Sequence, residues 1–496
     1  MSLLEVLSEL RAAHSAQIAA WRHFPERPAR RAPTPETLHP ALKDGLRRRG
    51  IPALYTHQAE AVASALHGEH VCVVTPTASG KTMCYNLPTL QALLNDPAAR
   101  ALYIFPTKAL AQDQVTELGR WQTTLNAPVA AATYDGDTPA SARARVRKSA
   151  RVIVTNPDML HTGILPHHTR WAELFEGLRV VVLDEMHTYR GVFGSHVANV
   201  LRRLRRIAAW YGAQPQFILS SATIANPTDL ATRLVEAPVT VVNDDGAPRG
   251  ERHFILVNPP IVDYKLGIRR SVAAEATTLA RHCLAGDVQT AVFAGSRLSA
   301  EVILHNLQNA AQTPVRGYRS GYLPQERRAT EAGLRDGSVR GVVSTNALEL
   351  GVDIGGLDAV IIAGYPGTIA STWQQAGRAG RRGSLAAAML VARGMPLDQY
   401  LVAHPEYILG TADGAIPSPE HALVNPDNAL ILTDHIRCAA FELPFAVDEA
   451  FGASVPHPQP LSHFGRGAGG EGLDFQKPRP PRRAARTRRS GCGRSG

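Results

Sequence analysis

The segment HVCVVTPTASGKTMCYNLPTL (70–90) decides the fold, because a short apolar run leads into a polar, glycine-bearing loop and then into a helical pattern. A loop that opens a helix in this way directs backbone N–H groups inward and binds anions such as phosphate. Its lysine is placed to reach the β- and γ-phosphates of a nucleotide, and the threonine after it to bind Mg²⁺. We therefore predict a phosphate-binding loop made of Thr75, Pro76, Thr77, Ala78, Ser79, Gly80, Lys81 and Thr82. Thr75 and Ala78 stand where such loops often carry glycine.

Short apolar runs alternate with longer helical patterns along most of the chain, which is typical of βαβ units and parallel sheets. The first half contains the runs 70–75, 101–105, 151–155, 179–184 and 216–220. The second half contains the runs 253–257, 290–294, 341–345, 358–363 and 387–392. We predict an α/β protein with two tandem parallel-sheet domains, 41–245 and 253–410, joined by a linker, GAPRGER (246–252).

The flanking segments read differently from the two domains. Residues 1–40 predict a short helical extension followed by a Pro/Arg-rich connector, and 411–454 predict an irregular helical segment. The stretch 455–496 is rich in Arg, Pro and Gly and lacks the apolar residues needed to order itself, so we expect a disordered basic tail.

Charge and cysteine usage limit the function classes. The 496 residues carry 53 Lys+Arg and 43 Asp+Glu, a net charge of +10, which indicates a polyanionic partner. Nine basic and two acidic residues fall in the tail, so the rest of the chain is only +3. The 5 cysteines are scattered, which argues against a disulfide framework or a self-contained zinc site. We find no signal peptide and no membrane-spanning run, and expect a cytoplasmic protein with no membrane partner.

Polar residues at three further places suit nucleotide chemistry. Asp184 and Glu185 follow a predicted strand, where Asp184 can hold the metal and Glu185 can polarise the attacking water. Upstream of the loop, the Gln58 amide can read an adenine edge while Tyr55 covers its face; taken alone, both residues would indicate an ordinary helix start, and the loop downstream is what favours the nucleotide role. In the second domain, Arg378 and Arg381 are expected on one helical face, suited to γ-phosphate charge, or else form a basic surface turn.

The order of motifs resembles the superfamily 2 DEAD/DEAH-box helicases. The matching stretches are LYTHQ (54–58), TPTASGKT (75–82), FPTKALAQDQ (105–114), TNPDML (155–160), DEMH (184–187), SSAT (220–223), STNALELGVDIG (344–355) and QQAGRAGRR (374–382). The resemblance implies two RecA-like domains that bind ATP and Mg²⁺. It assigns ATP contacts also to Gly351 and Asp353, and a catalytic place to Gln374 beside the arginine fingers Arg378 and Arg381. It assigns coupling of hydrolysis to movement to His187, Ser221, Ala222 and Thr223.

The same resemblance implies contacts to a nucleic-acid backbone. The residues that match are Pro106, Thr107, Lys108, Thr155, Asn156, Arg297 and Thr345. Hydroxyl, amide and cationic side chains of this kind contact sugar and phosphate rather than base edges, so we expect binding that tolerates any sequence and weakens with salt.

A finer resemblance is to a subfamily of ATP-dependent DNA helicases linked to DNA repair, which carry a C-terminal four-cysteine zinc domain. DEMHTYRGVFGSHVANVLRRLRR (184–206), YPGTIASTWQQAGRAGRRG (365–383) and HALVNPDN (421–428) carry this resemblance. It stops near residue 450, and we expect that the zinc domain has been lost by truncation. The implied function is an ATP-dependent helicase or translocase on single-stranded or tailed duplex DNA, a monomer with a repair nuclease as a partner. An RNA helicase of the DEAD type and a remnant that binds nucleic acid without unwinding it are the alternatives.

The run LRRLRR (201–206) follows the carboxylate motif within a helical pattern. We interpret it as a solvated helix face, with steering of DNA as the alternative.

Overall fold

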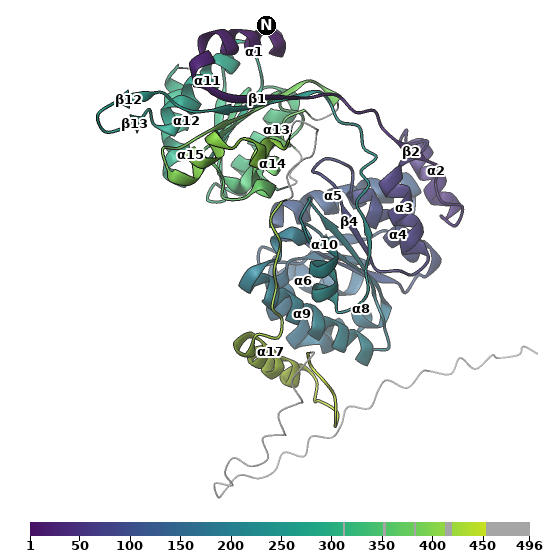
Figure 1. The fold of residues 1–496 in the computed structure, drawn as a ribbon. Coiled ribbons are helices and arrows are strands. Elements are labelled where there is room, and N and C mark those ends of the chain that lie inside the picture. The colour runs from purple at the N-terminus through teal and green to yellow at the C-terminus, as the bar shows by residue number, and fades with distance from the viewer. Residues whose placement is uncertain (311–312, 351–353, 381–382, 412–418, 453–496) are drawn as a thin grey trace, which may run out of the picture.

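The computed structural model describes residues 1–310, 313–350, 354–380, 383–411 and 419–452, which form two lobes (Figure 1). Lobe 1 is built from residues 31–245, and residues 419–452 pack against it. Lobe 2 is built from residues 3–24 and from the described part of 252–411. The predicted α/β class with two parallel sheets is confirmed.

Lobe 1 contains a seven-stranded sheet in which every neighbouring pair is parallel. Both faces of the sheet are buried, because successive residues of a strand point to opposite sides: Val181 and Leu183 join one core, and Val180 and Val182 the other. In sheet order the strands are β10 (Thr240–Val242), β4 (Val71–Val74), β9 (Gln216–Ser221), β8 (Leu178–Leu183), β5 (Arg100–Ile104), β7 (Val152–Thr155) and β6 (Ala131–Thr133).

The helices of lobe 1 cover both faces of this sheet. They are α2 (Pro40–Arg48), α3 (Thr56–Leu66), α4 (Thr82–Asn95), α5 (Lys108–Leu125), α6 (Ala140–Ser149), α7 (Pro157–Met159), α8 (Ala172–Gly177), α9 (Gly191–Trp210) and α10 (Pro227–Val235). A small antiparallel pair, β2 (Arg31–Ala32) and β3 (Leu54–Tyr55), lies before α3.

Lobe 2 contains a second seven-stranded sheet, parallel except for its first strand. In sheet order the strands are β1 (Ile18–Phe24), β11 (Arg252–Val257), β18 (Ala386–Val391), β17 (Ala359–Ala363), β14 (Thr290–Ala294), β16 (Gly341–Ser344) and β15 (Val315–Tyr318). A hairpin of β12 (Ile261–Asp263) and β13 (Ile268–Arg269) projects from it.

The helices of the second half begin with α1 (Leu3–Ala13), which packs on α11 of lobe 2. The others in this lobe are α11 (Val272–Ala285), α12 (Arg297–Ala310), α13 (Pro324–Asp336), α14 (Ile369–Ala376), α15 (Pro396–Ala403) and α16 (Glu406–Leu409). A last helix, α17 (Ala429–Glu442), packs on α9 of lobe 1. None of the helices in the described ranges is long and apolar enough to cross a membrane.

The N-terminal segment differs from its prediction. Only a helix and a connector were expected in 1–40, but β1 adds an edge strand to lobe 2, antiparallel to β11. Trp21 near its middle and Phe24 at its end pack against the two cores of that lobe, which explains why this stretch is ordered. The N-terminal segment is therefore part of lobe 2, and it then crosses to lobe 1 at β2.

The interpretation of LRRLRR as a solvated helix face is wrong. Within α9, Arg203 is fully buried and Arg202 is 7 % exposed. Arg203 makes a two-pronged ion pair with Glu442, and Arg202 pairs with Asp427. Both partners belong to the C-terminal segment, more than 220 residues further along the chain, so the helix periodicity alone could not reveal them.

Candidate functional site

The predicted phosphate-binding loop lies between the end of β4 and the start of α4. The Lys81 ammonium folds back into the loop and donates to the main-chain carbonyls of Thr75 (2.8 Å) and Pro76 (3.1 Å). The hydroxyls of Thr75 and Ser79 are hydrogen-bonded at 2.6 Å and close the loop from behind. The cation therefore lies inside the curve of the loop, where the N–H groups that open α4 also favour negative charge.

Ala78 and Gly80 give the loop its curvature, since both have left-handed backbones, with φ of 66° and 83°. A Cβ at Gly80 would come within 2.6 Å of the Gln58 side-chain nitrogen. That nitrogen donates to the Gly80 carbonyl (2.9 Å), while the Gln58 oxygen accepts from the Tyr55 N–H (3.0 Å). Gln58 thus braces the loop here, and the adenine-reading roles of Gln58 and Tyr55 stay predictions.

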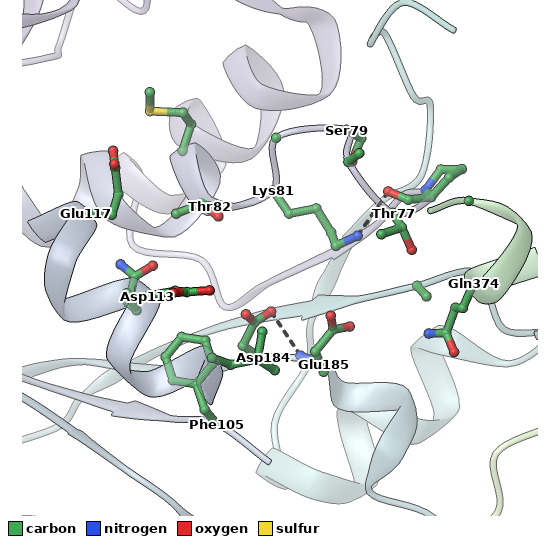
Figure 2. A pocket seen from close by; sticks show the side chains of 18 of the residues that line it. Thr77, Ser79, Lys81, Thr82, Phe105, Asp113, Glu117, Asp184, Glu185 and Gln374 are labelled. Carbon is green, nitrogen blue, oxygen red and sulfur yellow. Dashed lines mark hydrogen bonds between the residues drawn. The ribbon is translucent and has the colours of Figure 1, made fainter. Parts of the chain in front are cut away.

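The two acidic residues that follow β8 point in different directions (Figure 2). Asp184 accepts hydrogen bonds from its neighbour's N–H (2.9 Å), from the Ser220 hydroxyl and from the Tyr85 hydroxyl (3.4 Å). Burial and the charge of Glu185 raise the pKa of Asp184 to about 6. Glu185 has a left-handed backbone, with φ of 51°, which turns its carboxylate away from that of Asp184.

His187 connects this acidic pair to the other lobe. Its Nδ1 accepts from the Ala222 N–H (3.2 Å) and lies 3.5 Å from the Glu185 carboxylate. Its Nε2 lies 2.6 Å from the side-chain amide of Gln374, which belongs to α14 of lobe 2. Burial, and then the charge of Lys81, lower the pKa of His187 to about 3, so the ring is neutral at physiological pH. Two of the predicted coupling residues, His187 and Ala222, thus lie in contact, and His187 reaches Gln374 across the lobe interface.

A large cleft of about 2540 Å³ runs between the lobes. Its lobe 1 wall includes the phosphate-binding loop, Tyr55, both acidic residues and Thr223. Its lobe 2 wall includes Trp373, Gln374 and Gly377. Except for Gln58 and Thr75, which do not line the cleft, the predicted nucleotide residues of lobe 1 therefore face residues of lobe 2 across one space, as Figure 2 shows for Lys81, Glu185 and Gln374.

The predicted nucleic-acid residues of lobe 1 lie at or just after the ends of the neighbouring strands β5 and β7, and several of them make local hydrogen bonds or ion pairs. Thr107 caps α5 through the Leu110 N–H, and Lys108 pairs with Asp137 (2.6 Å). Asn156 caps α7, and Pro106 is half-buried beside this group. The Thr155 hydroxyl is buried and donates to the Tyr134 carbonyl (2.7 Å), so it faces the interior.

A second cavity of about 770 Å³ lies at the lobe interface and contains Arg297 and Thr345, two predicted nucleic-acid residues of lobe 2. Arg190 and Arg393 also line it, and the sequence interpretation missed both. Two glycines, Gly364 and Gly295, flank the Arg393 guanidinium. A Cβ atom at these positions would come within 2.0 and 2.7 Å of it, so only glycine leaves room for the arginine. The cavity is therefore rich in cationic groups suited to phosphates.

Arg378 of the second domain does not lie on a helical face, which corrects the prediction for that residue. Helix α14 ends at Ala376, and Arg378 lies in the turn after it. Arg378 is fully buried and donates from Nε and Nη2 to the Glu349 carbonyl, at 3.2 and 2.5 Å. Its finger role stays a prediction. Gly351, Asp353 and Arg381 lie outside the described residues.

Ser220 and Tyr85 are the other site residues that the sequence interpretation missed. Ser220 directly precedes the predicted Ser221, so motif order could have suggested it. Tyr85 is buried on α4 and touches Asp184 only because β8 lies beside that helix, and nothing in its local sequence signals this.

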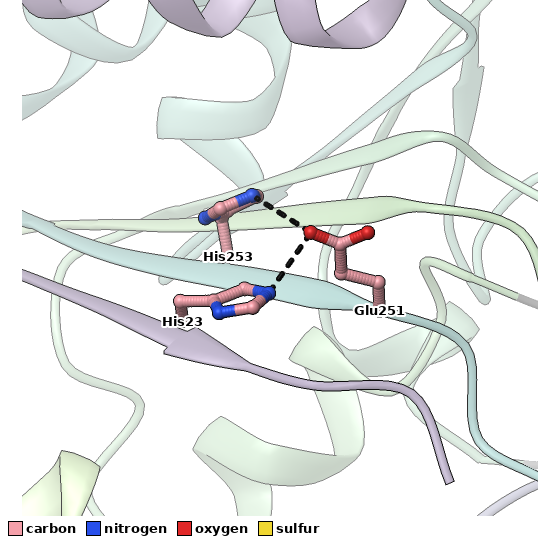
Figure 3. Close-up of side chains that lie close together, drawn as sticks. All are labelled: His23, Glu251 and His253. Carbon is pink, nitrogen blue, oxygen red and sulfur yellow. Dashed lines mark hydrogen bonds and ion pairs between the residues drawn. The ribbon is translucent and has the colours of Figure 1, made fainter.

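One group in the described part of the chain has metal-ligand spacing: His23, Glu251 and His253, on the β1–β11 edge (Figure 3). The Glu251 carboxylate lies 2.9 Å from His23 Nε2 and 3.7 Å from His253 Nε2. However, Trp21 Nε1–H donates to His253 Nδ1 (3.0 Å), which places the ring hydrogen of a neutral His253 on Nε2. A histidine that binds a metal through one ring nitrogen normally donates a hydrogen bond from the other, whereas Nδ1 of His253 accepts one. The cluster therefore suits hydrogen bonding between neighbouring strands better than metal binding.

Comparison with known proteins agrees with this geometry. The DEAD/DEAH box helicase model matches residues 55–230, and the helicase conserved C-terminal domain model matches residues 275–383. The chain is 52 % identical over 457 residues to the uncharacterized ATP-dependent helicase YprA of Bacillus subtilis, covering 91 % of this chain and 60 % of that protein. It is 40 % identical over 446 residues to the ATP-dependent helicase HRQ1 of Saccharomyces cerevisiae, covering 87 % of this chain and 41 % of that protein.

Among solved structures, the crystal structure of the DUF1998 helicase MrfA bound to DNA and AMPPNP matches with a TM-score of 0.86 at 52 % identity. The match covers 91 % of this chain and 63 % of that one. The chain thus spans less than two thirds of the length of each of these relatives.

Proposed function

The chain belongs to the DEAD/DEAH-box ATP-dependent helicases, and from that premise we propose that it couples ATP hydrolysis to movement along single-stranded DNA in DNA repair. The observation that carries the proposal is the contact of His187 with Gln374 across the lobes. Because His187 also contacts Glu185 and Ala222, a change at the hydrolysis site alters the bond that joins the lobes. Such a link is what a motor of two lobes requires.

The residues of the cleft divide the chemistry among them. When ATP binds, the Lys81 ammonium gives up its hydrogen bonds to the two loop carbonyls and binds the phosphates instead. Glu185 accepts a proton from the attacking water. Thr82 and Asp184 would hold Mg²⁺, and a divalent cation fits there because Asp184 is a buried carboxylate beside a second one. When bound, Mg²⁺ supplies positive charge that offsets the charge developing on the phosphates.

DNA is favoured as the polymer because the MrfA structure that matches this chain at 52 % identity is a complex with DNA. The candidate contacts in this chain include an arginine, a lysine, hydroxyls and an amide, which suit a sugar-phosphate backbone of any sequence. We further propose that the motor acts as a monomer and that a repair nuclease cooperates with it.

The test is steady-state ATP hydrolysis with no polymer, with single-stranded DNA and with single-stranded RNA. We expect strong stimulation by DNA alone. Stimulation by RNA alone would favour an RNA helicase of the DEAD type, and stimulation by neither would favour the remnant.

Glu185→Gln serves as the blank in this assay. We expect it to lower turnover by at least about a hundredfold, as loss of a general base does, while ATP and DNA still bind. Glu173→Gln, an exposed residue of α8, is the matched control and should hydrolyse ATP like the wild type. Persistent turnover in Glu185→Gln would show that the base has been assigned to the wrong residue.

A further inference from the structure

Residues 419–443, which we call the strap, join the two lobes beside the site (Figure 1). The main chain of the strap binds lobe 1: Ala422 exchanges two hydrogen bonds with the Asn226 side chain (2.8 and 3.1 Å), and the Leu423 carbonyl accepts from Gly191 N–H (2.6 Å). The strap ends in α17, which the buried Arg203–Glu442 pair fixes to α9. Its main chain is thus anchored to lobe 1.

One side chain of the strap reaches the other lobe. The Glu420 carboxylate accepts from the N–H groups of Ile369 (2.5 Å) and Ala370 (3.3 Å), the first two residues of α14. Thr368 caps the third N–H of this helix, on Ser371. A carboxylate at this end satisfies donors that have no partner within the helix and lies at the positive end of its dipole. Glu420 therefore holds the start of the helix that carries Gln374.

The main chain at Glu420 lies against the coupling motif of lobe 1. Its carbonyl accepts from Ala225 N–H (3.4 Å), two residues after Thr223. His187, Gln374 and Glu420 line the same cavity at the interface. One residue thus contacts the segment after the coupling motif through its backbone and the Gln374 helix through its side chain.

We propose that Glu420 is a positioning residue that sets the His187–Gln374 contact and so couples ATP hydrolysis to the lobe 2 movement. This inference rests on the proposed function. Helix α14 has only eight residues, so the placement of its first turn governs where Gln374 lies. Without Glu420, two N–H groups at the interface lose their acceptor, and the helix is free to shift relative to His187. The nucleotide loop and Glu185 are not touched by Glu420, so ATP binding does not depend on it.

The experiment measures kcat and KM for DNA-stimulated ATP hydrolysis in the wild type, Glu420→Ala and Glu420→Gln. We expect Glu420→Ala to lower kcat by roughly tenfold to a hundredfold, the cost of a small misplacement, with the KM for ATP nearly unchanged. Glu420→Gln keeps an oxygen that accepts an N–H, and should recover much of the rate. Glu406→Ala, which removes an exposed glutamate of α16, is the matched control and should behave as the wild type.

A double-mutant cycle with Gln374→Ala separates positioning from general support. If Glu420 acts through Gln374, the double variant should be no slower than the slower single variant. Rate losses that multiply, or an unchanged kcat in Glu420→Ala, would overturn the inference. If Glu420→Ala does not fold, Glu420→Gln and its own cycle with Gln374→Ala decide the question in the same way. Wild-type protein that DNA does not stimulate would instead overturn the proposed function itself.

Discussion

Arg393 lies where three strands of lobe 2 end, against glycines that follow β14 and β17. The carboxyl ends of parallel strands are where sheets of this kind bind their ligands. Among the described residues no carboxylate pairs with its guanidinium, although Arg297 and Thr345 share its cavity. An arginine that lies between two glycines and pairs with no carboxylate of the described residues is suited to bind a phosphate of the proposed DNA strand.

The Arg393→Ala substitution should therefore weaken the binding of DNA without changing the binding of ATP. We expect the slope of log Kd against log salt to fall by about 0.7, the value for one phosphate contact on a single strand. The measurement is fluorescence anisotropy with a labelled oligonucleotide at several salt concentrations. Arg281→Ala, an exposed arginine of α11, is the control. An unchanged slope would show that Arg393 contacts no phosphate.

A buried ion pair between Arg203 and Glu442 is one of the contacts that hold helix α17 on lobe 1. Glu442→Ala would leave Arg203 fully buried and uncompensated, so we expect the free energy of unfolding to fall by about 3–5 kcal/mol. Glu449→Ala removes a more exposed partner, from Arg206, and should cost at most about 1 kcal/mol. Urea unfolding of the three proteins tests this. Equal losses in the two variants would mean that burial does not distinguish the pairs.

The elements that the sequence predicted and those that it missed differ in one physical property. All ten predicted strands exist, because a strand buried on both faces reads as a continuous apolar run. Within the two seven-stranded sheets the missed strands are β1, β6, β10 and β15, which are the four edge strands; the short pairs β2–β3 and β12–β13 were missed as well. An edge strand has one open side and tolerates polar residues, as in the sequence IAAWRHF of β1.

The same distinction holds for the candidate site. The loop, the acidic pair and His187 were found because each lies within a short motif that has its own chemistry. Glu420, Tyr85 and Arg393 act on that chemistry from places fixed only by the tertiary fold. Contacts between residues distant in sequence leave no local pattern, so these residues could be identified only in the folded molecule.

At the scale of the whole molecule, the chain passes between the lobes in more than one place. Two crossings, 25–30 and 243–251, run side by side, since Arg27 and Arg249 exchange main-chain hydrogen bonds of 2.8 and 2.9 Å. The Asp245 carboxylate accepts from the side chains of both arginines, at 2.8 and 2.9 Å. Asp245 is 6 % exposed, so this junction is a buried fastening of the two crossings.

Asp245→Ala should loosen that junction and weaken communication between the lobes. We expect the ratio of DNA-stimulated to basal ATP hydrolysis to fall by roughly severalfold, as for changes at a hinge. The ratio is measured in the hydrolysis assay with and without single-stranded DNA. Asp244→Ala, the exposed neighbour that pairs with Arg30, is the control. If both variants kept the wild-type ratio, the junction would have no part in the coupling.

The paired crossings have a mechanical consequence. One connecting chain would let lobe 2 swivel about lobe 1 in any direction, whereas two hydrogen-bonded chains resist torsion and bend most easily across their flat face. Such a pair of chains favours opening and closing about one axis. For the motor proposed above, a preferred direction of closing would make the length of each step along DNA depend on the geometry of this ribbon.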